Sequence, residues 1–384
     1  MSELLFHLVT ALLPVAAFSG WYLGMRVARK RSLTEQDRLS DSYLQGLNHL
    51  LEHDEEKTLS LLHHLGEGTS PSVALRFVLA ALHLRRGEIS QAIMLYESLL
   101  NDYTLESAVR DKARMELANG YRQAGLFDRA EKLYYQLSTT PYRWVALQQL
   151  LRLYDQERDW PRAATICERL CQHQSHYGRI LAHYYCQLAE ESGSVAERRR
   201  YIALALEWDS GSVRASLLQG ALAEEAAEFL TAIAAYRRVV QQDSLFVAEI
   251  VAPLTRCYLA LQQPEQVIPL LRQLLCHRHS SVVAAMDAIR FPEPIASEIP
   301  ALLRELIRHH PSLWALKCLL SYESEEGATS PLAPQSPLYH SLRQLIEQLC
   351  RRELLYRCEQ CGLTLQQLHW HCPGCHQWGS IKPA

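Results

Sequence analysis

A long, uninterrupted apolar segment opens the chain. Residues 4–25, LLFHLVTALLPVAAFSGWYLGM, hold one ionisable side chain, His7. About 20 such residues cross the ~30 Å hydrocarbon core of a bilayer. Trp21 and Tyr22 lie near its end, where amphipathic rings favour the membrane interface. The six residues that follow, RVARKR, carry four positive charges. The pattern predicts an N-terminal transmembrane anchor over residues 1–25 and a basic cytoplasmic juxtamembrane segment over residues 26–38.

Two other interpretations of this segment are weaker. A cleaved signal peptide carries its positive charge before the apolar run, whereas here the charge comes after it. A buried core helix is rarely so uniformly apolar. The positive-inside rule then places the amino terminus outside and the rest of the chain in the cytoplasm.

After the first 38 residues the apolar pattern becomes a repeat. Residues 84–100, 122–137 and 155–170 each show a polar turn, then a small residue, then an apolar helical face. Taking the small residue as an anchor gives near-periodic positions through the chain, with a degenerate unit at Arg198: Thr58, Ala92, Ala130, Ala163, Arg198, Ala232 and Val267. The steps of 33 to 38 residues resemble the tetratricopeptide repeat, whose period is 34.

Other positions recur around these anchors. A small residue is needed where the second helix of a pair crosses the first, and aromatic side chains fill the groove between neighbouring pairs. The recurring residues are the aromatics nine before the anchor (Tyr121, Tyr154, Tyr258) and four after it (Tyr96, Tyr134, Tyr236), a turn glycine five before (Gly87, Gly125) and a helix glycine twelve before (Gly46, Gly220). The sequence therefore predicts an all-α solenoid of tetratricopeptide repeats over residues 39–322.

The repeat pattern weakens after Val282. Residues 291–300, FPEPIASEIP, hold three prolines and predict a bent connection, and residues 302–322 return to helical periodicity. Residues 323–337 are rich in proline, glutamate and small polar residues, which is typical of a linker. A last helix is predicted from about Leu338 to Arg352, so that residues 338–384 form a terminal helix and a small C-terminal domain.

Composition and motifs argue against several function classes. The net charge of −3 shows no basic excess of the kind that nucleic-acid binders carry. Of the 11 cysteines seven are scattered, which argues against a disulfide framework and for a reducing compartment. No phosphate-binding glycine loop, GxSxG or HExxH motif occurs, so an enzyme is not expected. The histidine pairs at 63–64 and 309–310 fit a helix surface, and Cys167 with Cys171 fits core packing.

The sharpest motif lies near the C-terminus. Two Cys-x-x-Cys pairs, Cys358 with Cys361 and Cys372 with Cys375, are ten residues apart. Each pair can aim two sulfurs at one ion, and four thiolates suit tetrahedral Zn²⁺ or iron. With all ligands supplied by cysteine no coordination position stays open, so the predicted site is structural. Metal binding would supply the folding free energy of so small a module.

The residues around the cysteines have predicted roles as well. Gly362 and the Pro373-Gly374 pair fit turns whose backbone amides point at sulfur. His369, His371 and His376 are interpreted as flanking or surface side chains and not as ligands. Trp370 and Trp378 are expected to dock the module against the solenoid, and the module is expected to lock the end of the solenoid.

The whole chain resembles the lipopolysaccharide assembly protein B family of Gram-negative bacteria. The resemblance lies in LLPVAAFSGWYLG with its basic collar, GLFDRAEKLYYQL, ALQQLLRLY at 146–154, and YRCEQCG…WHCPGC…WGSIKP. The last stretch is similar to that family's rubredoxin-type domain, which implies a metal-ligand role for Cys358, Cys361, Cys372 and Cys375. The unit near Arg198 and residues 280–337 match the family poorly.

The resemblance implies a regulatory function at the inner membrane. Members of the family act as adaptors that promote degradation of the deacetylase that commits precursors to lipid A, together with the membrane-bound protease FtsH. A membrane sensor of lipopolysaccharide opposes them. The expected cofactor is one zinc or iron ion per chain, and a homo-oligomer is left open.

Two alternatives come from other classes. A membrane-tethered, rubredoxin-like redox protein would use iron in the four-cysteine site for electron transfer. A nucleic-acid-binding zinc ribbon is disfavoured, because Arg357 and Lys382 are the only basic side chains past Glu353 and phosphate neutralisation needs more.

Overall fold

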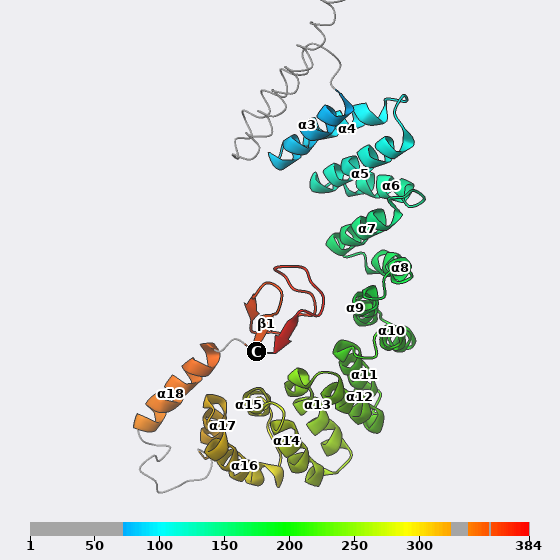
Figure 1. Cartoon of the computed structure of the whole chain (residues 1–384). Coiled ribbons are helices and arrows are strands. Elements are labelled where there is room, and N and C mark those ends of the chain that lie inside the picture. Colours follow the sequence, from blue (N-terminus) through cyan, green and yellow to red (C-terminus); the bar gives the residue numbers. More distant parts are fainter. Residues whose placement is uncertain (1–71, 324–336, 353–354, 384) are drawn as a thin grey trace, which may run out of the picture. The chain divides into compact units, whose positions relative to one another are not determined.

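The computed structural model describes residues 72–323, 337–352 and 355–383 (Figure 1). These residues form two compact units, divided between Leu153 and Tyr154. The predicted membrane anchor, the basic segment, the repeat at Thr58 and most of the predicted linker lie outside the described residues. Within the described part of the chain, no helix has the length and apolar character needed to cross a membrane.

The first unit consists of antiparallel helix pairs. Its helices are α3 (Val73–Arg85), α4 (Ile89–Leu100), α5 (Ser107–Gln123), α6 (Phe127–Leu137) and most of α7 (Arg143–Glu157). Ser72 caps α3 by accepting the backbone N–H of Leu75 at 3.2 Å. The anchors Ala92 and Ala130 are completely buried, as are the neighbouring rings of Tyr96 and Tyr134. The small anchor lets the two helices of a pair approach closely, as the repeat pattern predicts.

The second unit continues the helix pairs and ends in a small sheet. Its helical elements are α8 (Trp160–Cys171), α9 (Tyr177–Glu191), α10 (Val195–Trp208), α11 (Val213–Glu225), α12 (Phe229–Gln242), η1 (Ser244–Phe246), α13 (Val247–Ala260), η2 (Pro264–Gln266), α14 (Val267–Leu275), α15 (His279–Asp287), α16 (Ile295–His309), α17 (Leu313–Glu323) and α18 (Pro337–Arg352). The sheet has the order β2-β1-β3, with β1 (Tyr356–Cys358), β2 (Thr364–Leu365) and β3 (Ile381–Pro383) all antiparallel.

In five of the helix pairs the turn uses a left-handed backbone residue. Gly87 and Gly125 have φ of 78° and 74°, five residues before their anchors. The equivalent residues of three later pairs are not glycine but adopt the same conformation: Arg158 (φ 58°), Ala227 (φ 57°) and Gln262 (φ 56°). A side chain costs about 1–2 kcal/mol in this region. The packing of the paired helices therefore imposes the turn even where the sequence carries no glycine to mark it.

The degenerate unit keeps the pair but changes its chemistry. Arg198 occupies the anchor position of α10 and is half-buried, with its guanidinium 2.7 Å from the Glu225 carboxylate. The chain enters α10 through Ser192, which is extended with φ −74° and ψ 130°. At the position where the other repeats bury a small residue, this repeat therefore has an ion pair between Arg198 and Glu225 of the following repeat.

The region after Val282 differs from the sequence prediction. One continuous core cluster extends from Val213 to Leu319, so the solenoid does not weaken there. Helix α16 already begins at Ile295 and contains Pro300, and the predicted connection ends before it. Pro300 lies inside the helix, where it cannot donate a hydrogen bond to the carbonyl of Ala296. The predicted helical stretch 302–322 is divided between α16 and α17, whereas the terminal helix is confirmed as α18.

A glycine contact in α11 tests the helix-crossing argument. A Cβ at Gly220 would lie 2.4 Å from the Tyr236 ring, whereas at Gly120 it would meet nothing closer than Ile93 at 3.7 Å. Gly220→Ala should lower the free energy of unfolding by about 1–3 kcal/mol, because a buried ring cannot move aside. Gly120→Ala is the matched control and should be neutral or stabilising by up to about 1 kcal/mol. Urea unfolding of both variants measures the difference, and equal stabilities would contradict the crossing role.

Candidate metal centre

Two similar turns form the four-cysteine module, here called the knuckle (residues 356–383). In the first turn the Gly362 N–H donates to the Cys358 carbonyl at 3.0 Å, with Gly362 at φ 75°. In the second the His376 N–H donates to the Cys372 carbonyl at 2.9 Å, with His376 at φ 58°. Because the two turns match, each brings two sulfurs to the same side. His376 thus has the backbone role of a glycine, which its side chain does not reveal in the sequence.

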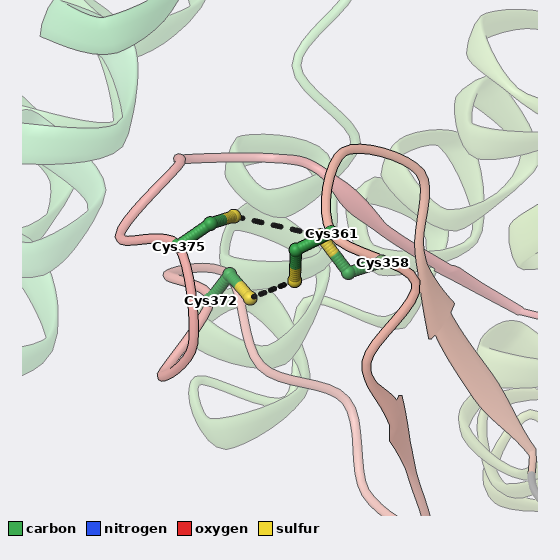
Figure 2. Close-up of side chains that lie close together, drawn as sticks. All are labelled: Cys358, Cys361, Cys372 and Cys375. Carbon is green, nitrogen blue, oxygen red and sulfur yellow. Dashed lines mark hydrogen bonds between the residues drawn. The ribbon is translucent and has the colours of Figure 1, made fainter. Parts of the chain in front are cut away.

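The four predicted cysteines come together in one cluster (Figure 2). All four sulfurs lie within 4.8 Å of one another, and the pairs Cys358–Cys375 and Cys361–Cys372 are 3.7 Å apart. A tetrahedron with metal–sulfur bonds of ~2.3 Å has sulfur–sulfur edges of about 3.8 Å. The donor set therefore fits a tetrahedral thiolate-binding ion. Among the described residues, these four cysteines form the group of three or more ligating side chains that lies close enough together to hold a metal ion.

The surroundings of the sulfurs favour uneven protonation without an ion. The Ser380 hydroxyl, 3.3 Å from the Cys358 sulfur, lowers the pKa of Cys358 to about 6, and the Cys361 and Gln360 backbone amides add to this. At Cys375 the Gln377 backbone amide lowers the pKa. Burial and the neighbouring thiols outweigh it and raise the pKa of Cys375 to about 12. Several thiolates at such separations repel one another, so their common ionisation needs a bound cation.

Trp378 docks the knuckle on the repeats, as predicted. Its ring contacts Trp160 and Tyr184 edge-on, with centroids 5.7 and 5.5 Å away, and its Nε1 donates to Asp155 Oδ1 at 3.2 Å. The same carboxylate accepts from the Tyr184 hydroxyl at 3.1 Å and lies 3.3 Å from His371 Nε2. Asp155 therefore joins α7, α9 and the knuckle. None of the three flanking histidines adds its ring to the sulfur cluster.

A second set of ring contacts encloses His183 of α9. Its ring stacks on Trp378 at 5.5 Å and lies 6.1 Å from Trp370, and Trp370 stacks on Phe246 at 5.4 Å. A Cβ at Gly379 would come within 2.7 Å of His183 Nε2, so this glycine is required for the close approach. Burial and the nearby positive charges of Arg214 and Lys382 lower the pKa of His183 to about 3.

Charged groups complete the docking surface. Arg214 is 3% exposed and donates to Glu190 Oε2 and Gln187 Oε1, both at 2.7 Å, while its guanidinium lies 5.7 Å from the Trp378 ring centroid. A buried arginine is tolerated because all its donors find partners.

Strands β1 and β3 make further contacts with the helical repeats. Lys382 Nζ lies 2.7 Å from Asp243 Oδ2, Arg278 donates to the Pro383 carbonyl at 3.2 Å, and the Tyr356 hydroxyl donates to Glu249. The knuckle thus lies along α7, α9, α11, η1 and α13, beside the helices of the second unit in Figure 1. The expectation that it locks the end of the solenoid is incomplete, because its contacts extend from the middle repeats to α18, where Gln366 Nε2 donates to the Arg351 carbonyl at 3.4 Å. Sequence reasoning found the tryptophans but missed Asp155, His183, Arg214 and Ser380, whose partners are remote in sequence.

The fold and the site define a class: a tetratricopeptide-like helical repeat protein that carries a rubredoxin-type four-cysteine module. Residues 356–383 match the family described as the rubredoxin metal binding domain. Over its full length the chain is 32% identical to lipopolysaccharide assembly protein B of Escherichia coli strain K12, covering 98% of that protein, and 31% identical to the protein of that name from Haemophilus influenzae, again covering 98%. The chain belongs to the lipopolysaccharide assembly protein B family.

Among solved structures, the C-terminal part of a repeat-containing protein from Cytophaga hutchinsonii is similar with a TM-score of 0.41 and 12% identity. The match covers 65% of this chain and 100% of that one.

Loss of one sulfur tests the metal centre. Cys372→Ser should reduce bound zinc or iron from about one ion per chain to well below half, because a structural site needs all four ligands. Without the ion the knuckle should leave the repeats, exposing Trp370 and Trp378 and shifting their fluorescence to the red. Elemental analysis and fluorescence of the purified chain measure both. Cys276→Ser, which removes an exposed thiol elsewhere, is the control. Full metal content in the Cys372 variant would contradict the assignment.

The neutral state of His183 predicts a pH dependence. An unfolded histidine has a pKa near 6.5, so below that pH the unfolded chain binds a proton that the folded chain excludes. The free energy of unfolding should therefore fall below pH ~6.5, by at most about 1.4 kcal/mol per pH unit from this residue. His183→Phe, which preserves the stacking, should flatten the dependence, whereas His277→Phe at an exposed site should not. Urea unfolding at pH 7 and 5.5 measures it. An unchanged slope in His183→Phe would count against the assignment.

Proposed function

We propose that this protein is an inner-membrane adaptor that regulates lipopolysaccharide biosynthesis. In this role it promotes FtsH-dependent proteolysis of the deacetylase that commits precursors to lipid A, and a membrane protein that senses lipopolysaccharide opposes it. The observation that carries the proposal is family membership over the whole chain, since the matched relatives are named for lipopolysaccharide assembly. The helical repeats and the rubredoxin-type module of this chain accompany that match.

The architecture supports binding over catalysis. Helical repeats offer an extended surface to a partner protein and contain no built-in reactive groups. The apolar segment over residues 4–25 would hold this surface at the membrane, with the amino terminus in the periplasm and the repeats in the cytoplasm. A tether next to a membrane-bound protease raises the effective concentration of a captured substrate without any new contact.

The knuckle would hold one zinc or iron ion through Cys358, Cys361, Cys372 and Cys375. The bound ion would neutralise the thiolates and fold the module. The chain's own residues then position that module on the repeats, through Trp378, Asp155 and Lys382. The four ligands leave no site for a substrate, which supports a structural ion.

Electron transfer is the second candidate, favoured by the exposure of Cys361 at the outer edge of the sulfur cluster. An iron site of this type is red when oxidised and a zinc site is colourless. Purification of the full chain from its own host distinguishes the two by colour and elemental content. A colourless zinc protein rules out the redox function.

Depletion of the protein in its host tests the adaptor function. The half-life of the lipid A-committing deacetylase, followed by immunoblot after synthesis is stopped, should lengthen several-fold, and lipopolysaccharide should rise. Restoring the intact chain should reverse both effects. An unchanged deacetylase half-life would mean that the family's role does not extend to this chain in this form.

A further inference from the structure

The contacts of the knuckle identify the inward-facing positions of each repeat. Four residues that contact the knuckle lie at fixed distances before the anchor of their own repeat. The distance is 15 residues for His183, 18 for Arg214 and Glu249, and 8 for Asp155. The positions 18, 15, 11 and 8 residues before the anchor follow helical spacing, so they lie on one face of the first helix in each pair. In the second unit the knuckle covers this face.

The same positions in the first unit carry a different set of side chains, here called the inner row. On α5 and α7, to which the name is restricted, it consists of Lys112, Met115, Asn119 and Arg122, and of Val145, Gln148 and Arg152. Three of these seven are permanently or normally cationic. Among the described residues of the first unit, no carboxylate forms an ion pair with Lys112, Arg122 or Arg152. Lys112 instead lies 5.0 Å over the ring of Phe77.

The buried Tyr134 hydroxyl is influenced by the charges of both arginines of the inner row. It donates to Asn119 Oδ1 at 2.8 Å. Burial raises the pKa of Tyr134 to about 12, while the charges of Arg122 and Arg152 act against this rise. The Arg122 Nε is buried and has no hydrogen-bond partner among the described residues. A carboxylate, Glu116, is also near and accepts from the Asn119 amide at 3.4 Å.

The chemistry of the inner row selects an anionic, extended ligand. Each guanidinium presents a planar fork of donors that matches a carboxylate. The amide of Gln148 can pair with the backbone of an extended peptide, whereas the Asn119 amide already binds Tyr134 and Glu116. Val145, 46% exposed, gives an apolar contact for an aliphatic side chain. Lys112, Arg122 and Arg152 outnumber the two carboxylates on or beside this face, Glu116 and Asp155, and leave a positive surface that complements an acidic chain.

We propose that the inner row of α5 and α7 binds an extended acidic segment of a partner protein, with Arg122 and Arg152 pairing with its carboxylates. The inference deepens the adaptor function by naming the surface and the chemistry that hold the substrate. It rests on that function only for the identity of the protein that carries the segment.

The experiment measures peptide binding by the full-length chain in a neutral detergent. The probe is a fluorescein-labelled peptide of the sequence (Glu-Ala-Leu-Asp) repeated three times, with a free carboxyl terminus. Its partner is the amide analogue (Gln-Ala-Leu-Asn) repeated three times. Fluorescence anisotropy should show tighter binding of the acidic peptide, weakened by added salt. Arg122→Gln with Arg152→Gln should reduce its affinity at least tenfold.

Two further variants keep the result interpretable. Arg129→Gln with Lys132→Gln removes the same charge from exposed positions of α6, the second helix of the pair, and should change affinity less than twofold. Arg122→Glu with Arg152→Glu should lose the acidic peptide and bind a lysine-containing counterpart, an outcome that misfolding cannot produce. Equal binding of acidic and amide peptides, or equal losses in the α5–α7 and α6 variants, would overturn the proposal.

The deacetylase half-life separates this inference from the adaptor function. If Arg122→Gln with Arg152→Gln loses the peptide and also lengthens the half-life in cells, both are supported. If the peptide is lost while the half-life stays short, the site stands and binds a different acidic partner. If peptide binding is unchanged while depletion of the chain still lengthens the half-life, the adaptor function stands and this site is wrong.

Discussion

Each helix pair leaves an apolar face that only the next pair can cover, and the rest of the structure depends on this constraint. A completely buried small anchor lets the helices of a pair approach closely, and tyrosines fill the space between pairs. The result is a core that continues from Val213 to Leu319 in the second unit. Where the anchor is arginine, an ion pair to Glu225 replaces the missing packing.

The inward face of the second unit holds the knuckle through both aromatic and charged side chains. A module of about thirty residues has almost no core beyond its cysteines and Ile381. The knuckle therefore buries its apolar surface against the repeats, with Trp370 and Trp378 packed on their aromatic rings. Asp155, Arg214 and Lys382 supply directional contacts, so the position is specific as well as stable. Loss of the ion would consequently destabilise the repeats as well, since the surface on which the knuckle docks would become exposed.

The inward faces of the two units also differ in chemistry. In the second unit the positions that point inward meet the knuckle, whereas in the first the equivalent positions carry Lys112, Arg122 and Arg152. One set of repeat positions thus serves two purposes, holding an internal module in one part of the chain and presenting positive charge in the other.

The sequence by itself determined the features that depend on local spacing. The anchors Ala92 and Ala130, the close approach at Gly220 and the four cysteines could all be predicted, because helical periodicity and knuckle turns depend on residues near one another in the chain. Tertiary structure alone decided the left-handed turn at Ala227, the start of α16 ahead of Pro300 and the place on the repeats where the knuckle binds. The Trp378–Asp155 hydrogen bond joins residues 223 positions apart. No local pattern encodes such a pairing, because it exists only after the repeats have stacked and placed the two residues side by side.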